Sequence, residues 1–140
     1  MILIVVTLLS CDSDDYPYAD IPSVVLNEFW SHFPDAKDVD FIKTGEDYEV
    51  DFELNGDDAG AVITPEGIVI REKKEVSFNE LPGAVQQALA VFDKNKLGDI
   101  EIIQIPDDTY YQVEVKRFWV DKKMVFDKTG EENKTINFWK

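Results

Sequence analysis

The chain carries one pattern twice, in the same order and about 60 residues apart. Four blocks of the first copy return in the second copy with offsets of 60 to 63 residues. The paired blocks are residues 21–25 and 81–85, 38–43 and 99–104, 47–52 and 110–115, and 64–67 and 127–130. A duplication of this length restricts the chain to folds made of two similar units that pack together.

Each copy is predicted to open with one amphipathic helix. Pro22 suits the first helical turn, where a missing backbone N–H costs little, and Pro34 ends the helix. Val25, Phe29 and Phe33 recur every four residues and therefore mark one buried face. The second copy has equivalent residues at Pro82, Val85, Leu89 and Phe92.

Strands are predicted to follow each helix. In the first copy Tyr48, Val50 and Phe52 alternate with acidic residues, which is typical of a sheet with one buried and one solvated face. The dipeptide Asn55-Gly56 suits a tight hairpin turn. The inward set is expected to continue through Ala59, Ala61, Ile63, Ile68 and Ile70, and in the second copy through Tyr111, Val113, Val115, Met124, Phe126, Ile136 and Phe138.

These patterns predict an α+β fold of two tandem α-β-β-β-β repeats, over residues 21–76 and 77–140. In each repeat the helix lies on one face of an antiparallel sheet. A unit of about 55 residues buries too little surface to be stable alone. We therefore expect the two repeats to share one extended sheet, which leaves one broad face free of helices.

The N-terminal residues indicate export. Residues 1–10 are uncharged and largely apolar, too few to span a bilayer as a helix, which needs ~20 residues, but suited to a signal peptide. Residues 8–10 and Cys11, the only cysteine, resemble a bacterial lipobox. We expect a lipoprotein signal peptide over 1–10, an acidic tether over 11–20, and a lipid anchor at Cys11 as the only membrane contact. The alternative is an N-terminal strand with a buried cysteine.

The charge of the chain restricts the classes of molecule that it is expected to bind. The net charge is −15, and residues 1–77 hold 18 acids against 5 bases, whereas residues 78–140 hold 11 acids against 9 bases. Such a chain repels phosphate backbones, so nucleic acid is not expected as a partner. Basic proteins or cations suit it better. The alternative is that the charge only keeps the protein soluble.

Three segments of the first copy carry a family resemblance. Residues 21–29 (IPSVVLNEF), 33–41 (FPDAKDVDF) and 48–56 (YEVDFELNG) are similar to the beta-lactamase-inhibitor-like, PepSY-like proteins of Bacteroidetes. The resemblance extends over residues 21–140 and is looser in the second copy. It implies a tandem α-β4 fold and a location in the periplasm or at the cell surface. It describes likeness of fold, which does not fix function.

No catalytic motif is recognisable in the sequence. His32 is the only histidine, so the sequence offers neither a zinc site nor a histidine base beside a nucleophile. Glu49 and Asp51 on one strand face are spaced as glycosidase carboxylates can be, but any acidic strand produces that spacing. We predict that the protein is not an enzyme and has no cofactor. Turn acids such as Asp57 and Asp107 lack EF-hand spacing, which leaves a calcium-binding surface lipoprotein as the alternative function.

The solvated face of the sheet is the remaining candidate site. An acidic face with scattered apolar groups suits a basic or mixed protein or peptide, and an exposed tryptophan is a frequent interface anchor. We therefore predict a non-catalytic binding or inhibitor-like module. The alternative is an ordinary solvated sheet. The predicted partner-binding residues are Asp38, Asp40, Glu49, Asp51, Glu53, Arg71, Glu101, Glu114 and Trp119.

Overall fold

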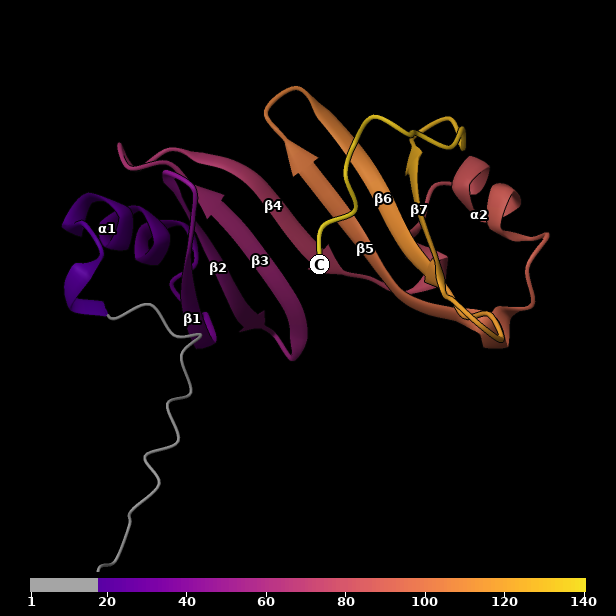
Figure 1. The fold of residues 1–140 in the computed structure, drawn as a ribbon, viewed down its shortest axis with the longest axis horizontal. Coiled ribbons are helices and arrows are strands. Elements are labelled where there is room, and N and C mark those ends of the chain that lie inside the picture. The colour runs from indigo at the N-terminus through magenta and orange to yellow at the C-terminus, as the bar shows by residue number, and fades with distance from the viewer. Residues whose placement is uncertain (1–17) are drawn as a thin grey trace, which may run out of the picture.

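The computed structural model describes residues 18–140, which form one antiparallel sheet of seven strands in chain order with two helices (Figure 1). The helices are α1 (Ser23–His32) and α2 (Gly83–Leu89). The strands are β1 (Lys37–Thr44), β2 (Asp47–Leu54), β3 (Asp57–Ile63), β4 (Val69–Glu75), β5 (Leu97–Ile105), β6 (Asp108–Val115) and β7 (Lys122–Asp127). The predicted signal peptide and the lipidation of Cys11 lie outside the described residues.

The two copies share the sheet, as the duplication predicted. Strand β4 of the first copy pairs with β5 of the second, from Glu72 opposite Gln104 to Glu75 opposite Glu101. The pairing of β4 with β5 removes one exposed edge from each copy, which a small sheet otherwise leaves open.

Among residues 18–140, neither helix has the length and apolar character that crossing a membrane requires.

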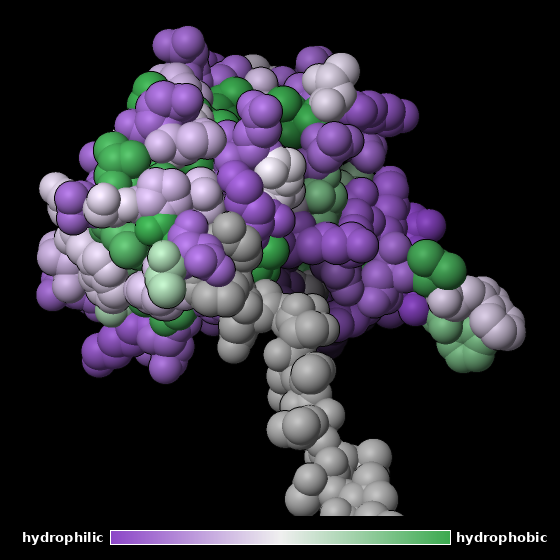
Figure 2. Space-filling view, turned by 60° about the vertical axis from the view of Figure 1, so that its left-hand side comes forward, coloured by the Kyte–Doolittle hydropathy of each residue, from purple (hydrophilic) through white to green (hydrophobic). Residues whose placement is uncertain are grey.

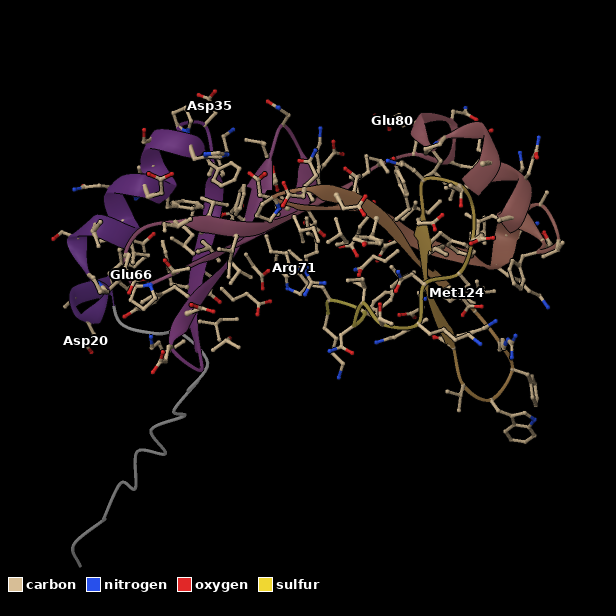
Figure 3. All side chains as sticks on the ribbon, turned by 90° about the horizontal axis from the view of Figure 1, so that it is seen from above. Asp20, Asp35, Glu66, Arg71, Glu80 and Met124 are labelled. Carbon is tan, nitrogen blue, oxygen red and sulfur yellow. The ribbon has the colours of Figure 1, made fainter. Side chains whose placement is uncertain are left out.

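Each helix buries its predicted apolar stripe against its own half of the sheet. Val25 and Phe29 of α1 are fully buried in the first core, where the Phe29 ring lies 5.3 Å from Phe41 and 5.2 Å from Phe52 between centroids. Val85 and Leu89 of α2 are buried in the second core. Both helices cover the same face of the sheet (Figure 3).

A pair of equivalent glycines shows the duplication in three dimensions. Gly67 and Gly130 both adopt positive φ, +81° and +83°. A Cβ at Gly67 would lie 2.8 Å from Val24 Cγ2, and a Cβ at Gly130 would lie 2.5 Å from the carbonyl oxygen of Ala84. Val24 and Ala84 hold equivalent positions in the two helices, so each copy packs its last turn against its helix in the same way.

The sequence predicts a fourth strand in the second copy, and this prediction is wrong. In the described part of the chain the second copy has three strands, and β7 is followed only by one isolated bridge, between Phe126 and Glu132. Asn133 redirects the chain because its Oδ1 accepts hydrogen bonds from the backbone N–H of Thr135 (2.9 Å) and Ile136 (3.0 Å). Such a side-chain turn competes with strand pairing. Ile136 and Phe138 therefore belong to a C-terminal segment, residues 128–140, rather than to a strand.

The start of β4 also differs from the prediction. The pairing of β3 with β4 shifts register between Val62 and Ile63, which is the mark of a β-bulge. The shift turns Val69 toward the first core and leaves Ile68, expected to face inward, 58% exposed. A one-residue shift exchanges the faces of a strand, which alternation alone does not reveal.

The sheet is strongly curved, with the helices on its convex side (Figure 3). The opposite side, here named the open face, is concave, and in the part of the chain that the structure describes no helix covers it. The C-terminal segment lies across its middle, over β4, β5 and β6, in both Figure 1 and Figure 3. The predicted helix-free face therefore exists, but it is not empty.

Candidate binding surface

A row of paired residues crosses the open face through all seven strands. The strand registers place Asp40, Asp51, Gly60, Lys73, Ile103, Tyr110 and Asp127 side by side in that order. Neighbouring rows add Glu49 and Arg71, then Glu53 and Asp58, then Glu101 and Gln112. Acids gather on β1 to β3, whereas β4 supplies the cations Arg71 and Lys73.

Trp139 of the C-terminal segment occupies the centre of the open face. It is only 6% exposed, and its indole Nε1–H donates to Glu49 Oε1 at 2.5 Å. Its backbone N–H donates to Gln112 Oε1 at 2.9 Å, and its carbonyl oxygen accepts from Gln112 Nε2 at 2.6 Å. Glu49 belongs to the first copy and Gln112 to the second, so Trp139 connects the two copies, with its side chain bound to one and its backbone to the other.

The cations of β4 support the same segment. Arg71 and Lys73 each lie 4.9 Å from the Trp139 ring, a cation–π distance. Arg71 Nη2 donates to the Asn137 carbonyl oxygen at 3.0 Å, and Lys73 Nζ donates to the Lys140 carbonyl oxygen at 2.9 Å. Gly60 leaves room for the ring, because a Cβ there would lie 3.3 Å from Trp139 Cζ2.

An acidic hollow of 490 Å³ lies beside the C-terminal segment. A bulge in β1 brings Asp38 to its rim, with φ of 49°. The hollow is lined by carboxylates from β1, β2, β3 and β5 and by two lysines. These charged residues are Asp38, Asp51, Glu53, Asp58, Lys73, Glu101 and Lys140.

Two carboxyl groups of this hollow, those of Asp51 and Glu101, have raised pKa values. Burial raises the pKa of Asp51; the nearby Lys73 opposes this change, and Glu49 and Asp58 each add a lesser increase. Burial also raises the pKa of Glu101, although its hydrogen bond from Gln112 and the nearby Lys73 lower it in part. A raised pKa means that the environment of the carboxyl group disfavours its ionised form. A cationic group entering the hollow would stabilise both carboxylates.

Arg71 lies partly buried at the edge of this arrangement. Burial lowers the pKa of its guanidinium, and the nearby Glu49 opposes that change. Its Nε is buried and has no hydrogen-bond partner within residues 18–140. Arg71, predicted as a partner-binding residue, is thus occupied by Asn137 and Trp139 of the same chain.

The structure brings some predicted residues together and separates others. Asp38, Asp51, Glu53 and Glu101 line the hollow, and Asp40 pairs with Asp51. Glu49 holds Trp139. Glu114 lies at the far end of β6, opposite Lys123, and Trp119 lies in the loop between β6 and β7, away from the hollow.

Sequence reasoning missed four residues of this surface. Asp58 was detectable, because the Asn55-Gly56 hairpin places it directly opposite Glu53. Lys73 follows Arg71 on the same strand face. Trp139 and Gln112 are not among the predicted partner-binding residues. Nothing in their local sequence indicates that they meet across 27 residues.

The described residues show no metal centre. Between residues 18 and 140 there is no group of three or more His, Cys, Asp or Glu side chains placed to hold an ion. His32 lies at the end of α1, with Nε2 2.9 Å from Glu72 Oε1. The acids of the hollow are therefore spread along a surface rather than gathered around one point.

Comparisons with known proteins identify the fold. No family model matches the chain, and no curated protein matches it. A candidate periplasmic protein of Bacteroides eggerthii has a similar crystal structure, with a TM-score of 0.72 and 20% identity, covering 79% of this chain and 84% of that one. A BLIP-like protein of Bacteroides fragilis has a TM-score of 0.65 and 20% identity, covering 80% of this chain and 82% of that one.

A third solved structure agrees with these two. A DUF2874 family protein of Bacteroides uniformis has a TM-score of 0.69 and 22% identity, covering 79% of this chain and 85% of that one. At sequence identities this low, the similarity concerns the fold and not the activity. The beta-lactamase-inhibitor-like resemblance expected from the sequence is confirmed at the level of the fold: the chain has the α+β fold shared by the BLIP-like and DUF2874 proteins of Bacteroides.

Proposed function

We propose that this protein is an extracytoplasmic, non-catalytic binding module that holds a basic protein or peptide on the acidic part of its open face. The observation that carries the proposal is the hollow beside Trp139, where four predicted acids, Asp38, Asp51, Glu53 and Glu101, line one concave surface. A concave surface lined mainly by acids is complementary in charge to a basic partner.

The electrostatics of the hollow favour a cationic partner. Burial raises the pKa of Asp51 and of Glu101, so the ionised form of each carboxyl is disfavoured in the hollow. Lys73 is the cation closest to them, but it also contacts the Trp139 ring and the Lys140 carbonyl. A lysine or arginine from a partner would neutralise this charge, and the surrounding negative field would speed its approach.

The comparisons support the compartment and the class of protein. One structural neighbour is a candidate periplasmic protein and another is BLIP-like. The proposed location is the periplasm or the cell surface, with the lipid at Cys11 as the anchor. Radioactive palmitate should label the wild-type chain in cells, and the Cys11→Ser variant should not be labelled.

A charge-reversal pair tests the proposed surface. Asp40→Lys combined with Asp51→Lys should abolish recovery of a partner from periplasmic or surface extract, because both positions face the hollow side of the open face. The matched control is Asp35→Lys combined with Glu66→Lys, which changes the net charge equally at exposed positions on the helix side (Figure 3).

Both double variants should keep the cooperative thermal unfolding of the wild type. A partner recovered equally with all three proteins would show that the acidic face is not the binding surface. A partner lost with both double variants would show that net charge alone drives association. Turnover of any substrate in a broad hydrolase screen would contradict the non-catalytic role.

A further inference from the structure

The loop between β6 and β7 presents three of the four most exposed large apolar side chains of the described residues. Phe118, Trp119 and Val120 are 88%, 87% and 77% exposed. The rings of Phe118 and Trp119 pack on each other, edge to face, with centroids 4.7 Å apart. The backbone N–H of Arg117 donates to Asp121 Oδ1 at 3.0 Å, which closes the loop below these three residues.

This loop stands clear of the rest of the protein. In Figure 2 it projects from the right-hand side of the molecule with hydrophobic atoms at its end. Figure 3 shows it extending on the side of the sheet opposite the helices. Three large apolar side chains at the tip of a projecting loop are not explained by packing within the chain, and exposed apolar groups gathered in this way mark interaction sites.

A collar of basic residues surrounds the tip. Residues 116–123 hold four bases, Lys116, Arg117, Lys122 and Lys123, against the single acid Asp121. Lys96 lies beside them, since the Lys116 N–H donates to the Lys96 carbonyl oxygen at 2.7 Å. Residues 116–123 therefore have a net charge of +3 in a chain whose net charge is −15, although Lys122 also pairs with Glu132 and Glu114 lies opposite Lys123.

We propose that the β6–β7 loop inserts Phe118, Trp119 and Val120 into the interface of an anionic lipid bilayer while its basic collar binds the headgroups. Tryptophan and phenylalanine prefer the boundary between headgroups and acyl chains. Lysine and arginine near the surface are attracted to anionic lipids. The combination of an apolar tip and a cationic collar matches both layers of such a surface.

The acidic hollow lies apart from the β6–β7 loop. The acids of the hollow belong to strands β1 to β3 and to Glu101, at the other end of the open face. Charges beyond about 8 Å are largely screened at physiological salt. The loop can therefore reach an anionic surface that would repel the rest of the chain. A protein partner is the competing occupant of the same tip.

Site-directed spin labels test this proposal in the full chain with Cys11→Ser. One label is placed at Val120→Cys, and the matched control carries it at Val91→Cys, which is 80% exposed and lies outside the collar. Accessibility to oxygen and to a water-soluble nickel reagent reports membrane depth. The vesicles are phosphatidylethanolamine with phosphatidylglycerol, compared with pure phosphatidylcholine.

We expect the label at 120 to become protected from the nickel reagent in anionic vesicles only, with the label at 91 unchanged. Lys116→Glu combined with Arg117→Glu should then weaken vesicle binding at least about tenfold, since each removed cation costs about a fivefold factor. Protection in neutral vesicles to the same degree would overturn the role of the collar. No protection at 120 in either vesicle would overturn the proposal and leave a protein partner for the tip.

This test is independent of the acidic hollow. The charge-reversal pair at Asp40 and Asp51 lies on β1 and β2, outside the β6–β7 loop. Failure of the membrane experiment would leave the proposed binding module standing, and failure of the partner experiment would leave the loop proposal standing.

Discussion

Gln112 holds the backbone of Trp139 through both ends of its side-chain amide: Oε1 accepts from the Trp139 N–H at 2.9 Å and Nε2 donates to the Trp139 carbonyl at 2.6 Å. Gln112 is the one buried polar or charged residue among those described, and it is fully inaccessible to solvent. The amide imitates the pairing that a neighbouring strand would offer. These two hydrogen bonds satisfy the buried amide of Gln112, and they also hold the C-terminal segment in place.

Gln112→Ala should release the C-terminal segment. The loss of both hydrogen bonds is expected to lower the free energy of unfolding by about 1–3 kcal/mol. Trp139 should then become solvated, and its fluorescence emission should shift to longer wavelength, because Trp30 and Trp119 are already 40% and 87% exposed. Urea denaturation followed by fluorescence measures both effects. An unchanged emission maximum would show that Gln112 does not hold the segment.

Glu49 and Trp139 should be energetically coupled across the two copies. The indole N–H donates to a carboxylate, and hydrogen bonds to charged groups contribute about 1.5–3 kcal/mol. Trp139→Phe removes the donor and keeps a ring, and Glu49→Gln removes the charge and keeps the shape. In a double-mutant cycle the sum of the single effects should exceed the effect of the double variant. Additive effects would mean that the pair contributes nothing.

Gly130→Ala should destabilise the protein far more than Gly45→Ala. Both glycines have positive φ, +83° and +63°, so alanine is strained at either position, by about 1–2 kcal/mol. Only at Gly130 would the new Cβ meet backbone, 2.5 Å from the Ala84 oxygen, whereas nothing lies within 4 Å at Gly45. We expect a loss of about 3 kcal/mol or more for Gly130→Ala. Equal thermal shifts of the two variants would contradict the close contact with α2.

Asp51→Asn should stabilise the protein at neutral pH. Burial raises the folded-state pKa of Asp51, so the folded protein binds a proton more readily than the unfolded chain. The ionised carboxylate therefore costs stability above the folded pKa, and this cost disappears as the pH falls toward the unfolded value near 3.8. The advantage of the asparagine variant in thermal unfolding should shrink over that pH range. An advantage that is independent of pH would show that ionisation of Asp51 is not its cause.

Much of the fold could be predicted because its signals are local and repeated. The stripe of Val25 and Phe29 and the alternation of Tyr48, Val50 and Phe52 depend only on helical and strand periodicity. The Asn55-Gly56 turn was identifiable because both residues adopt positive φ, 56° and 90°, which few residues other than glycine and asparagine tolerate.

The two wrong predictions about strands arose where one local feature outweighed the two-residue periodicity of the sequence. The bulge in the pairing of β3 with β4 exchanged the faces around Val69 and Ile68. The Asn133 side chain turned a segment that alternates like a strand away from the sheet edge. Neither event changes the apolar pattern, so periodicity could not reveal it.

The candidate binding surface was predicted only in part. The acids on the strands could be assigned to one face, because residues two apart in a strand point the same way. Trp119 could be singled out as an aromatic residue, but its distance from the hollow follows from the length of β6 and β7. The positions of Asp58 and Lys73 needed the strand registers.

The sequence by itself determined the duplication, the two helices, the helix-covered side of the sheet and the acidic character of the other side. These properties depend on spacing along the chain. Only the tertiary structure decided that Trp139 fills the middle of the open face, that Glu49 and Gln112 hold it from opposite copies, and that the aromatic loop stands apart with its basic collar. Those contacts join residues far apart in the chain, and their free energy depends on distances that spacing along the sequence does not specify.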